Sequence, residues 1–122
     1  MIVAGFGCRK AATVHSLMSA LLATGYRDRV ACLAAPDDKA QSIVFEEFAT
    51  SLGLSIRSCS SVELRAQKTQ TASQFSEKYR GTGSVAEAAA LVVAGTGAGL
   101  IVLRCISEDG MATCAIARGD AL

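Results

Sequence analysis

The sequence has few of the residues on which several kinds of functional site depend. Tryptophan is absent and aromatic residues make up only 5% of the chain, which argues against a base-stacking surface for nucleic acid. His15 is the only histidine, and the five cysteines contain no CxxC pair. These absences argue against a histidine-based metal site or a zinc site, so no metal is expected.

Long apolar runs and a charge of one sign are also missing. No apolar run approaches the ~20 residues of a membrane span, and no basic segment precedes an apolar one at the start of the chain. Acids and bases are interspersed, with a net charge of +1, whereas a nucleic-acid binder carries a basic patch or stripe. An odd number of cysteines without a signal segment is typical of a reducing compartment. We therefore expect a cytoplasmic protein that contacts neither nucleic acid nor membrane.

The residues that are present predict one α/β domain spanning residues 1–122. Apolar residues make up 51% of the chain, enough for a substantial core. Apolar runs at 2–4 and 30–34 and an alternating strand pattern at 54–57 are separated by helical patterns, and a helix and a hairpin follow. This order predicts a three-layer α/β/α fold with a mostly parallel sheet and a C-terminal antiparallel hairpin.

The opening stretch is the first candidate for a site. Its apolar run is followed by Gly5 and Gly7, which predict a glycine loop, and Thr13 is a good N-cap for a helix over 13–23. Arg9 and Lys10 add two positive charges beside that helix start. A strand, a glycine loop and a helix N-terminus in this order favour an anionic ligand.

A second helix is expected after Pro36, capped by Asp37 or Asp38, with Ile43 on its buried face. Acidic residues at a helix start are stabilising by themselves. Lys39 opposes the helix dipole there, which mildly favours a ligand or a carboxylate partner, although a solvated lysine is an equally good interpretation.

Two features are expected in the second half of the chain before the hairpin. Residues 67–71 contain no periodic apolar side chain and predict a mobile surface loop, and 73–79 predict a short helix or turn. Residues 80–83 form a second glycine loop, followed by a helix in which Ser84 and Glu87 have the spacing of a capping box.

The C-terminal hairpin is predicted from its turn. Asp109-Gly110 is typical of a type I′ turn, and this register pairs Cys105 with Cys114. We expect the two thiols to be reduced, with a cross-strand disulfide as the lesser alternative. Residues 100–106 begin apolar on both faces, which predicts an interior strand.

Known phosphate and dinucleotide motifs match poorly. The first glycine loop has GxG, but Lys10 stands where a dinucleotide-binding loop has its third glycine, and no Walker A pattern occurs. No cofactor is therefore predicted. Cys8 lies in an electropositive loop at a helix start, which lowers the pKa of a thiol. A reactive thiol and a small packing residue both remain interpretations of Cys8.

Several short motifs occur together in a fixed order. They are G-F-G-C-R at 5–9, the helix opening at Asp38-Lys39, the stretch from Thr71 to Ser73, S-V-A-E-A-A-A-L at 84–91 and T-C-A-I-A-R at 113–118. As a set, over residues 2–118, they resemble the CobE/CbiG C-terminal domain family of cobalamin (vitamin B12) biosynthesis.

The resemblance implies a role in corrin-ring synthesis. CbiG-type relatives open the ring lactone of a cobalt-precorrin and release a two-carbon fragment. The expected ligand is a precorrin or corrin intermediate, a tetrapyrrole whose acetate and propionate carboxylates suit helix N-termini and Arg or Lys side chains. Other cobalamin-pathway enzymes are further candidate partners. The expected ligand-binding residues are Gly5, Phe6, Gly7, Cys8, Arg9, Lys10, Lys39, Thr71, Ser73, Ser84 and Arg104.

Catalysis is left open. Asp38 or Glu87 would activate water if lactone hydrolysis occurs, but helix capping explains both residues. One alternative function is a non-catalytic carrier or assembly subunit for corrin intermediates. Another is a nucleotide- or phosphate-binding domain that shares only the fold.

Overall fold

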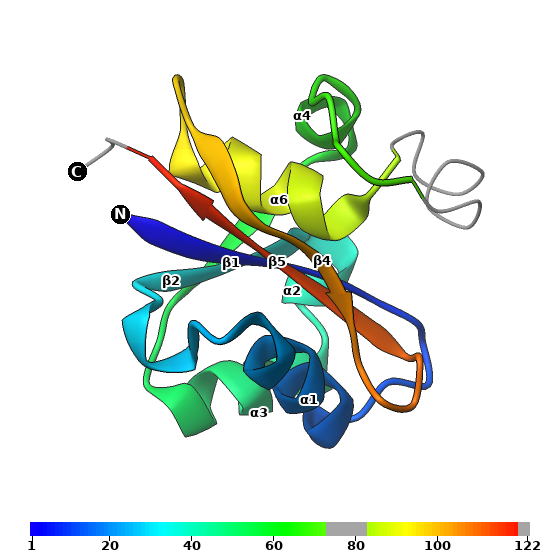
Figure 1. The fold of residues 1–122 in the computed structure, drawn as a ribbon. Coiled ribbons are helices and arrows are strands. Elements are labelled where there is room, and N and C mark those ends of the chain that lie inside the picture. The colour runs from blue at the N-terminus through cyan, green and yellow to red at the C-terminus, as the bar shows by residue number, and fades with distance from the viewer. Residues whose placement is uncertain (73–82, 120–122) are drawn as a thin grey trace.

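The computed structural model describes residues 1–72 and 83–119, which form a five-stranded sheet with helices on both faces (Figure 1). Along the sheet the strands lie in the order β3-β2-β1-β5-β4. The strands are β1 (Ile2–Cys8), β2 (Cys32–Pro36), β3 (Ile56–Cys59), β4 (Gly99–Ile106) and β5 (Ala112–Arg118). The helices are α1 (Val14–Thr24), the 3₁₀ turn η1 (Arg27–Arg29), α2 (Asp37–Ala40), α3 (Ile43–Leu52), α4 (Ser61–Arg65) and α6 (Val85–Ala94).

The sheet is mostly parallel, as the sequence predicts. Strands β1, β2 and β3 pair in parallel, whereas β5 pairs antiparallel with both β1 and β4. Strand β4 therefore runs in the same direction as β1, and β5 alone is reversed among these strands. Helices α1 and α3 cover one face of the sheet, and α4 and α6 cover the other (Figure 1). The three-layer α/β/α prediction is confirmed.

Each face of the sheet has its own core. Under α1 and α3, the rings of Phe6, Phe45 and Phe48 pack edge to face with centroids 5.3–5.9 Å apart. Under α6 the core is rich in small residues, because Ala88, Ala89 and other alanines of this helix are fully buried against the sheet. The second core brings the α6 backbone very close to β1.

The predicted glycine loop at 5–7 is wrong, because β1 continues through Cys8. A Cβ atom at Gly5 would overlap the carbonyl oxygen of Ala86 and the backbone nitrogen of Ala90. At Gly7 it would lie 3.3 Å from a methyl group of Val85. The absence of side chains at these glycines therefore lets α6 pack closely against β1. The loop after β1 begins at Arg9.

The predicted second helix is two helices. Ser42 interrupts it, because its hydroxyl accepts a hydrogen bond from the Phe45 amide (3.3 Å) and so caps α3. Neither Asp37 nor Asp38 caps α2, whose N-cap is Pro36. The break also rotates Ile43 outward, where it is 74% exposed instead of buried.

Other helix boundaries follow the sequence. Thr13 caps α1, and Gly25, with φ of 77°, ends it. Ser60 and Glu63 form the capping box of α4. Within the described part of the chain, no helix has the length and apolar character needed to cross a membrane. The predicted short helix at 73–79 and the residues around Gly81 lie outside the described residues.

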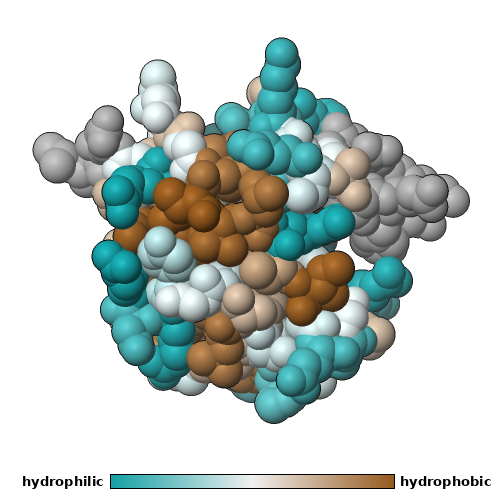
Figure 2. Space-filling view, viewed as in Figure 1, coloured by the Kyte–Doolittle hydropathy of each residue, from teal (hydrophilic) through white to brown (hydrophobic). Residues whose placement is uncertain are grey.

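Strand β4 lies at the edge of the sheet, so the predicted interior position is wrong. The interior strand of the hairpin is β5, which has partners on both sides. Apolar side chains stay visible along the β4 side (Figure 2), where Ile101 is 38% and Leu103 is 43% exposed. Two register shifts in β4 distort this edge, a device that discourages pairing with another strand.

The hairpin keeps the predicted register with a different turn. Cys105 pairs with Cys114 as predicted, and both are free thiols. A type I′ turn would need positive φ at Asp109, but among the described residues positive φ occurs only at glycines, here Gly110 (73°). The Gly110 amide instead donates to the Ser107 carbonyl oxygen (3.0 Å).

Candidate functional site

A cavity opens where β1 and β2 end, on the face of the sheet covered by α1 and α3. Its volume is about 340 Å³. Its walls come from the end of β1 and the loop after it, from α1, from α2 and from the start of α3. The lining residues are Cys8, Arg9, Lys10, Ala12, Leu17, Asp38, Lys39, Ser42, Val44 and Phe45.

Positive charge predominates in this cavity. Arg9, Lys10 and Lys39 line it together with a single carboxylate, that of Asp38. Within residues 1–72 and 83–119, neither the Lys10 nor the Lys39 ammonium group forms an ion pair. The cavity can therefore offer donors to an anionic group without first breaking an ion pair at either lysine.

The residues around these cations are placed by the backbone. Arg9 follows β1 directly, and its amide donates to the Met111 carbonyl oxygen (2.8 Å). Lys39 lies in α2, where its carbonyl oxygen accepts from the Ser42 hydroxyl (2.7 Å). Because β1 and β2 are neighbouring parallel strands, the segments that follow them meet at one edge of the sheet.

The structure divides the predicted site residues. Cys8, Arg9, Lys10 and Lys39 come together at the cavity. The side chain of Phe6 is fully buried in the aromatic core and forms support beneath this region. Gly5 and Gly7 face α6 on the opposite side of the sheet, so they do not line the cavity. Ser73 lies outside the described residues.

A second group of predicted residues gathers around Glu87, on the α6 face of the sheet. Oε1 of Glu87 accepts from the backbone amides of Gln70 (2.8 Å) and Thr71 (2.9 Å). Oε2 accepts from the Thr71 hydroxyl (2.6 Å) and the Arg104 amide (3.0 Å). The Arg104 guanidinium donates to the carbonyl oxygen of Ala72 (3.3 Å). Thr71 and Arg104 therefore serve to hold residues 70–72 against α6 and β4.

The predicted capping box at the start of α6 is only half formed. The Ser84 hydroxyl accepts from the Glu87 amide (3.3 Å), but the Glu87 carboxylate turns to residues 70–71 and to β4. Burial by itself would raise the pKa of Glu87, yet hydrogen bonds from Thr71, Arg104 and Gln70 outweigh it and hold the pKa below its ordinary value. A fully buried carboxylate with both oxygens engaged is not placed to activate water.

Two further polar residues line the cavity: Ser42, which the sequence did not indicate, and Asp38, which it indicated only as a helix cap or a possible base. Ser42 enters it because the chain leaves the helical path after Ala40, which the apolar spacing alone does not indicate. Asp38 has the composition of an ordinary first-turn acid, and only its position beside Lys39 brings it to the cavity wall. The available signal for Ser42 was that serine is a common helix N-cap and stands directly before the apolar residues of α3.

The fold and the cavity define a class of protein, an α/β domain that presents a cationic cavity at the ends of two parallel strands. Within that class the match is specific, because the family model for the cobalamin synthesis G C-terminus covers residues 2–117. The chain belongs to this family and is a cobalamin biosynthesis protein of the CobE and CbiG kind.

Solved structures agree with this family. CobE, a protein from the cobalamin biosynthetic pathway, is 28% identical with a TM-score of 0.86, over 97% of this chain and 89% of that one. Cobalamin biosynthesis protein chiG from Agrobacterium tumefaciens is 34% identical with a TM-score of 0.75, over 99% of this chain and 100% of that one. A putative cobalamin biosynthesis protein G homolog from Sulfolobus solfataricus shares the fold at 20% identity and a TM-score of 0.69, over 95% of this chain and 36% of that one. Comparison with curated protein sequences gives no match.

Proposed function

We propose that this protein binds a polycarboxylate tetrapyrrole intermediate of cobalamin biosynthesis and holds its acetate and propionate side chains in the cavity after β1 and β2. One observation carries the proposal: Arg9, Lys10 and Lys39 converge on a single cavity that only one carboxylate lines. Charge-assisted hydrogen bonds to carboxylates are stronger than neutral ones, and several act together on a ligand with several carboxylates.

The cavity volume limits how the ligand is held. About 340 Å³ lies at the lower end of the ~300–1,000 Å³ range of small-molecule sites. The cavity therefore takes one edge of a macrocycle with its acidic side chains, while the rest of the ring stays outside. Such an arrangement suits a protein that passes the ligand on as well as one that acts on its edge.

The test compares two corrins with the same ring and different side chains. Cobyrinic acid keeps its carboxylates free, and cobinamide carries amides in their place. In a visible-absorbance titration, cobyrinic acid is expected to give a saturable shift that weakens with added salt, and cobinamide a much weaker one. Equal affinity for both corrins would overturn the assignment to carboxylates. Tighter binding of an adenine nucleotide than of either corrin would favour the phosphate-binding alternative.

A second candidate function, lactone opening, is favoured by the position of Asp38 on the cavity wall. Asp38 would take a proton from water, whose oxygen bonds to the lactone carbonyl carbon. The ring C–O bond then breaks, and the released alkoxide takes up a proton. With a lactone-bearing intermediate, mass spectrometry of the recovered ligand distinguishes the functions: lactone opening adds the mass of one water, release of a two-carbon fragment then lowers the mass, and a carrier leaves the mass unchanged.

We also propose that the protein is located in the cytoplasm. All five cysteines are free thiols, and a cytoplasmic protein keeps them so because that compartment is reducing. Burial raises the pKa of the Cys59 thiol to about 12, with smaller contributions from Glu63 and Asp37, so this thiol stays protonated and unreactive.

A further inference from the structure

The Asp109 side chain binds the turn between β4 and β5 to the first turn of α1, and the Glu108 amide adds a hydrogen bond to the Ser19 hydroxyl further along that helix (3.0 Å). Oδ2 of Asp109 accepts from the Ser16 hydroxyl at 2.6 Å. Its Oδ1 accepts from the Ser107 hydroxyl (2.6 Å) and from the Met111 amide (3.0 Å). The Ser107, Ser16 and Met111 donors lower the pKa of Asp109 to about 2, so the group is ionised under all ordinary assay conditions.

Ser16 extends this contact to one end of the loop at 9–13. The hydroxyl of Ser16, which is fully buried, gives its single proton to Asp109, so its oxygen is left to accept. It accepts from the Thr13 amide (3.1 Å), and the Thr13 hydroxyl lies 3.1 Å away as a second donor. The Ser16 amide donates back to the Thr13 hydroxyl (3.2 Å). Thr13 is thereby fixed through Ser16.

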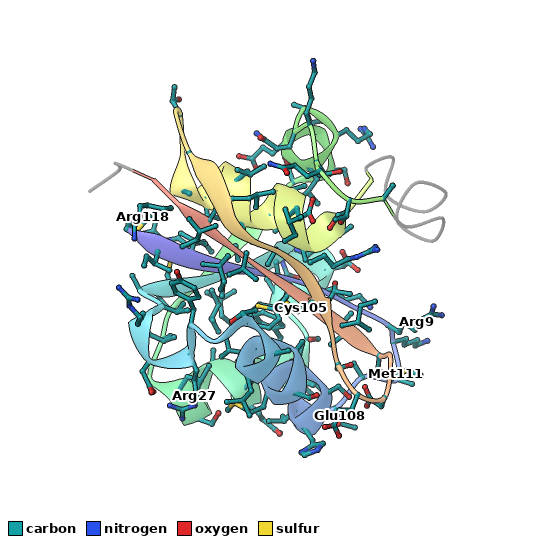
Figure 3. The ribbon with its side chains drawn as sticks, viewed as in Figure 1. Arg9, Arg27, Cys105, Glu108, Met111 and Arg118 are labelled. Carbon is teal, nitrogen blue, oxygen red and sulfur yellow. The ribbon has the colours of Figure 1, made fainter. Side chains whose placement is uncertain are left out.

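Met111 extends the contact to the other end of the same loop. Its amide donates to Asp109, and its carbonyl oxygen accepts from the Arg9 amide at 2.8 Å. Within the loop, the Ala12 amide donates to the Arg9 carbonyl oxygen (3.0 Å). Figure 3 shows Arg9 and Met111 beside each other at the end of the sheet where Glu108 lies, with Arg118 at the opposite end.

We propose that Asp109 is the positioning residue of the cationic cavity: by holding both ends of the loop at 9–13, it sets where Arg9 and Lys10 present their charges to an anionic ligand. This inference rests on the proposed function for its ligand. Asp109 does not line the cavity itself, so it acts only through the loop.

The sign of a mutational effect separates positioning from plain electrostatics. Asp109 is a negative charge close to a site for anions, so its removal should tighten binding if charge alone matters. If Asp109 positions the loop, Asp109→Asn should weaken binding in spite of the lost negative charge. Glu108→Gln is the matched control. Glu108 is next to Asp109 in the sequence and carries the same charge, but its side chain is exposed and holds no part of the loop.

The experiment measures the Kd of cobyrinic acid together with hydrogen exchange of the Arg9 and Ala12 amides. Asp109→Asn is expected to raise Kd at least about fivefold and to speed exchange of both amides, whereas Glu108→Gln should leave exchange unchanged and Kd the same or lower. Ser16→Ala keeps the Asp109 charge and removes the hydroxyl that joins Asp109 to the Thr13 amide, while the Ser16 amide still caps α1 through the Thr13 hydroxyl. It should therefore raise Kd in the same direction even if Asp109→Asn folds poorly.

The two readouts separate this inference from the proposed function. Unchanged exchange in both Asp109→Asn and Ser16→Ala would overturn the positioning role whatever the ligand does. Binding by Asp109→Asn that equals or exceeds that of Glu108→Gln would also overturn it. A third outcome is that hydrogen exchange is faster in Asp109→Asn and Ser16→Ala but the unmodified protein binds no corrin. This outcome would support positioning of the loop and would refute the proposed function.

Discussion

At the scale of single residues, Gly5 shows why a glycine in this sequence is easily misread. A glycine after a short apolar run has the pattern of a ligand-binding loop, and its role in admitting α6 depends on a helix eighty residues later in the chain. The spacing of nearby residues therefore does not predict the contact between Gly5 and α6. Arg9, Lys10 and Lys39, in contrast, were predictable, because charged residues that directly follow buried strands end up at one edge of a parallel sheet.

Gly5→Ala should destabilise the protein. The added methyl overlaps the α6 backbone at Ala86 and Ala90, which cannot move without opening the second core. The expected loss is about 2–3 kcal/mol of the free energy of unfolding, measured by urea denaturation. Gly99→Ala is the control, since its methyl would meet no atom within 4 Å, and it should change stability by less than ~0.5 kcal/mol. Equal stability of the two variants would contradict the close approach of α6 to β1.

At the scale of elements, the strands and helices were largely predictable, and their partners less so. Thr13 and Gly25 mark the ends of α1 by local capping chemistry, and the register of Cys105 with Cys114 follows from counting outward from the turn. The edge position of β4 was not predictable, because an apolar strand reads the same at an edge as in the interior. The role of Glu87 was also not predictable, because its hydrogen-bond partners lie in other parts of the chain.

Glu87 joins α6, residues 70–71 and β4, so its substitution should destabilise the packing of all three. Glu87→Gln turns one of two accepting oxygens into a donor that faces amide or hydroxyl donors. We expect a loss of about 1.5–3 kcal/mol in the free energy of unfolding at pH 7. Ser61→Ala, at an exposed position on α4, is the control and should have little effect.

The pH dependence of stability tests the same network. The folded pKa of Glu87 lies below its ordinary value of 4.5, so the unfolded chain takes up a proton first as the pH falls. The stabilisation by Glu87 is therefore complete above about pH 4.5 and is lost as the pH falls below that value through the folded pKa. Urea unfolding of Glu87→Gln between pH 7 and pH 3 should show a shallower decline than the unmodified protein. Parallel declines would rule out an ionised Glu87 at the centre of the network.

At the scale of the whole molecule, the candidate site lies at one end of the sheet. The loop at 9–13, the α2–α3 segment and the β4–β5 turn all lie where β1, β2 and β4 end. The rest of the fold, including the alanine-rich packing of α6, holds these segments in place. Because the chain belongs to a cobalamin biosynthesis family, we propose a pathway intermediate as the ligand of the cationic cavity at this end.

The most direct test of that claim removes one cation from the cavity and one from the far end. Lys39→Ala and Arg118→Ala delete the same charge, but Lys39 lines the cavity and Arg118 lies at the opposite end of the sheet (Figure 3). In a titration with cobyrinic acid, Lys39→Ala is expected to raise Kd about tenfold, since a hydrogen bond to a charged group contributes about 1.5–3 kcal/mol. Arg118→Ala should stay within about twofold of the unmodified protein. Equal effects of the two substitutions would contradict binding at this cavity and would leave only a general attraction between charges.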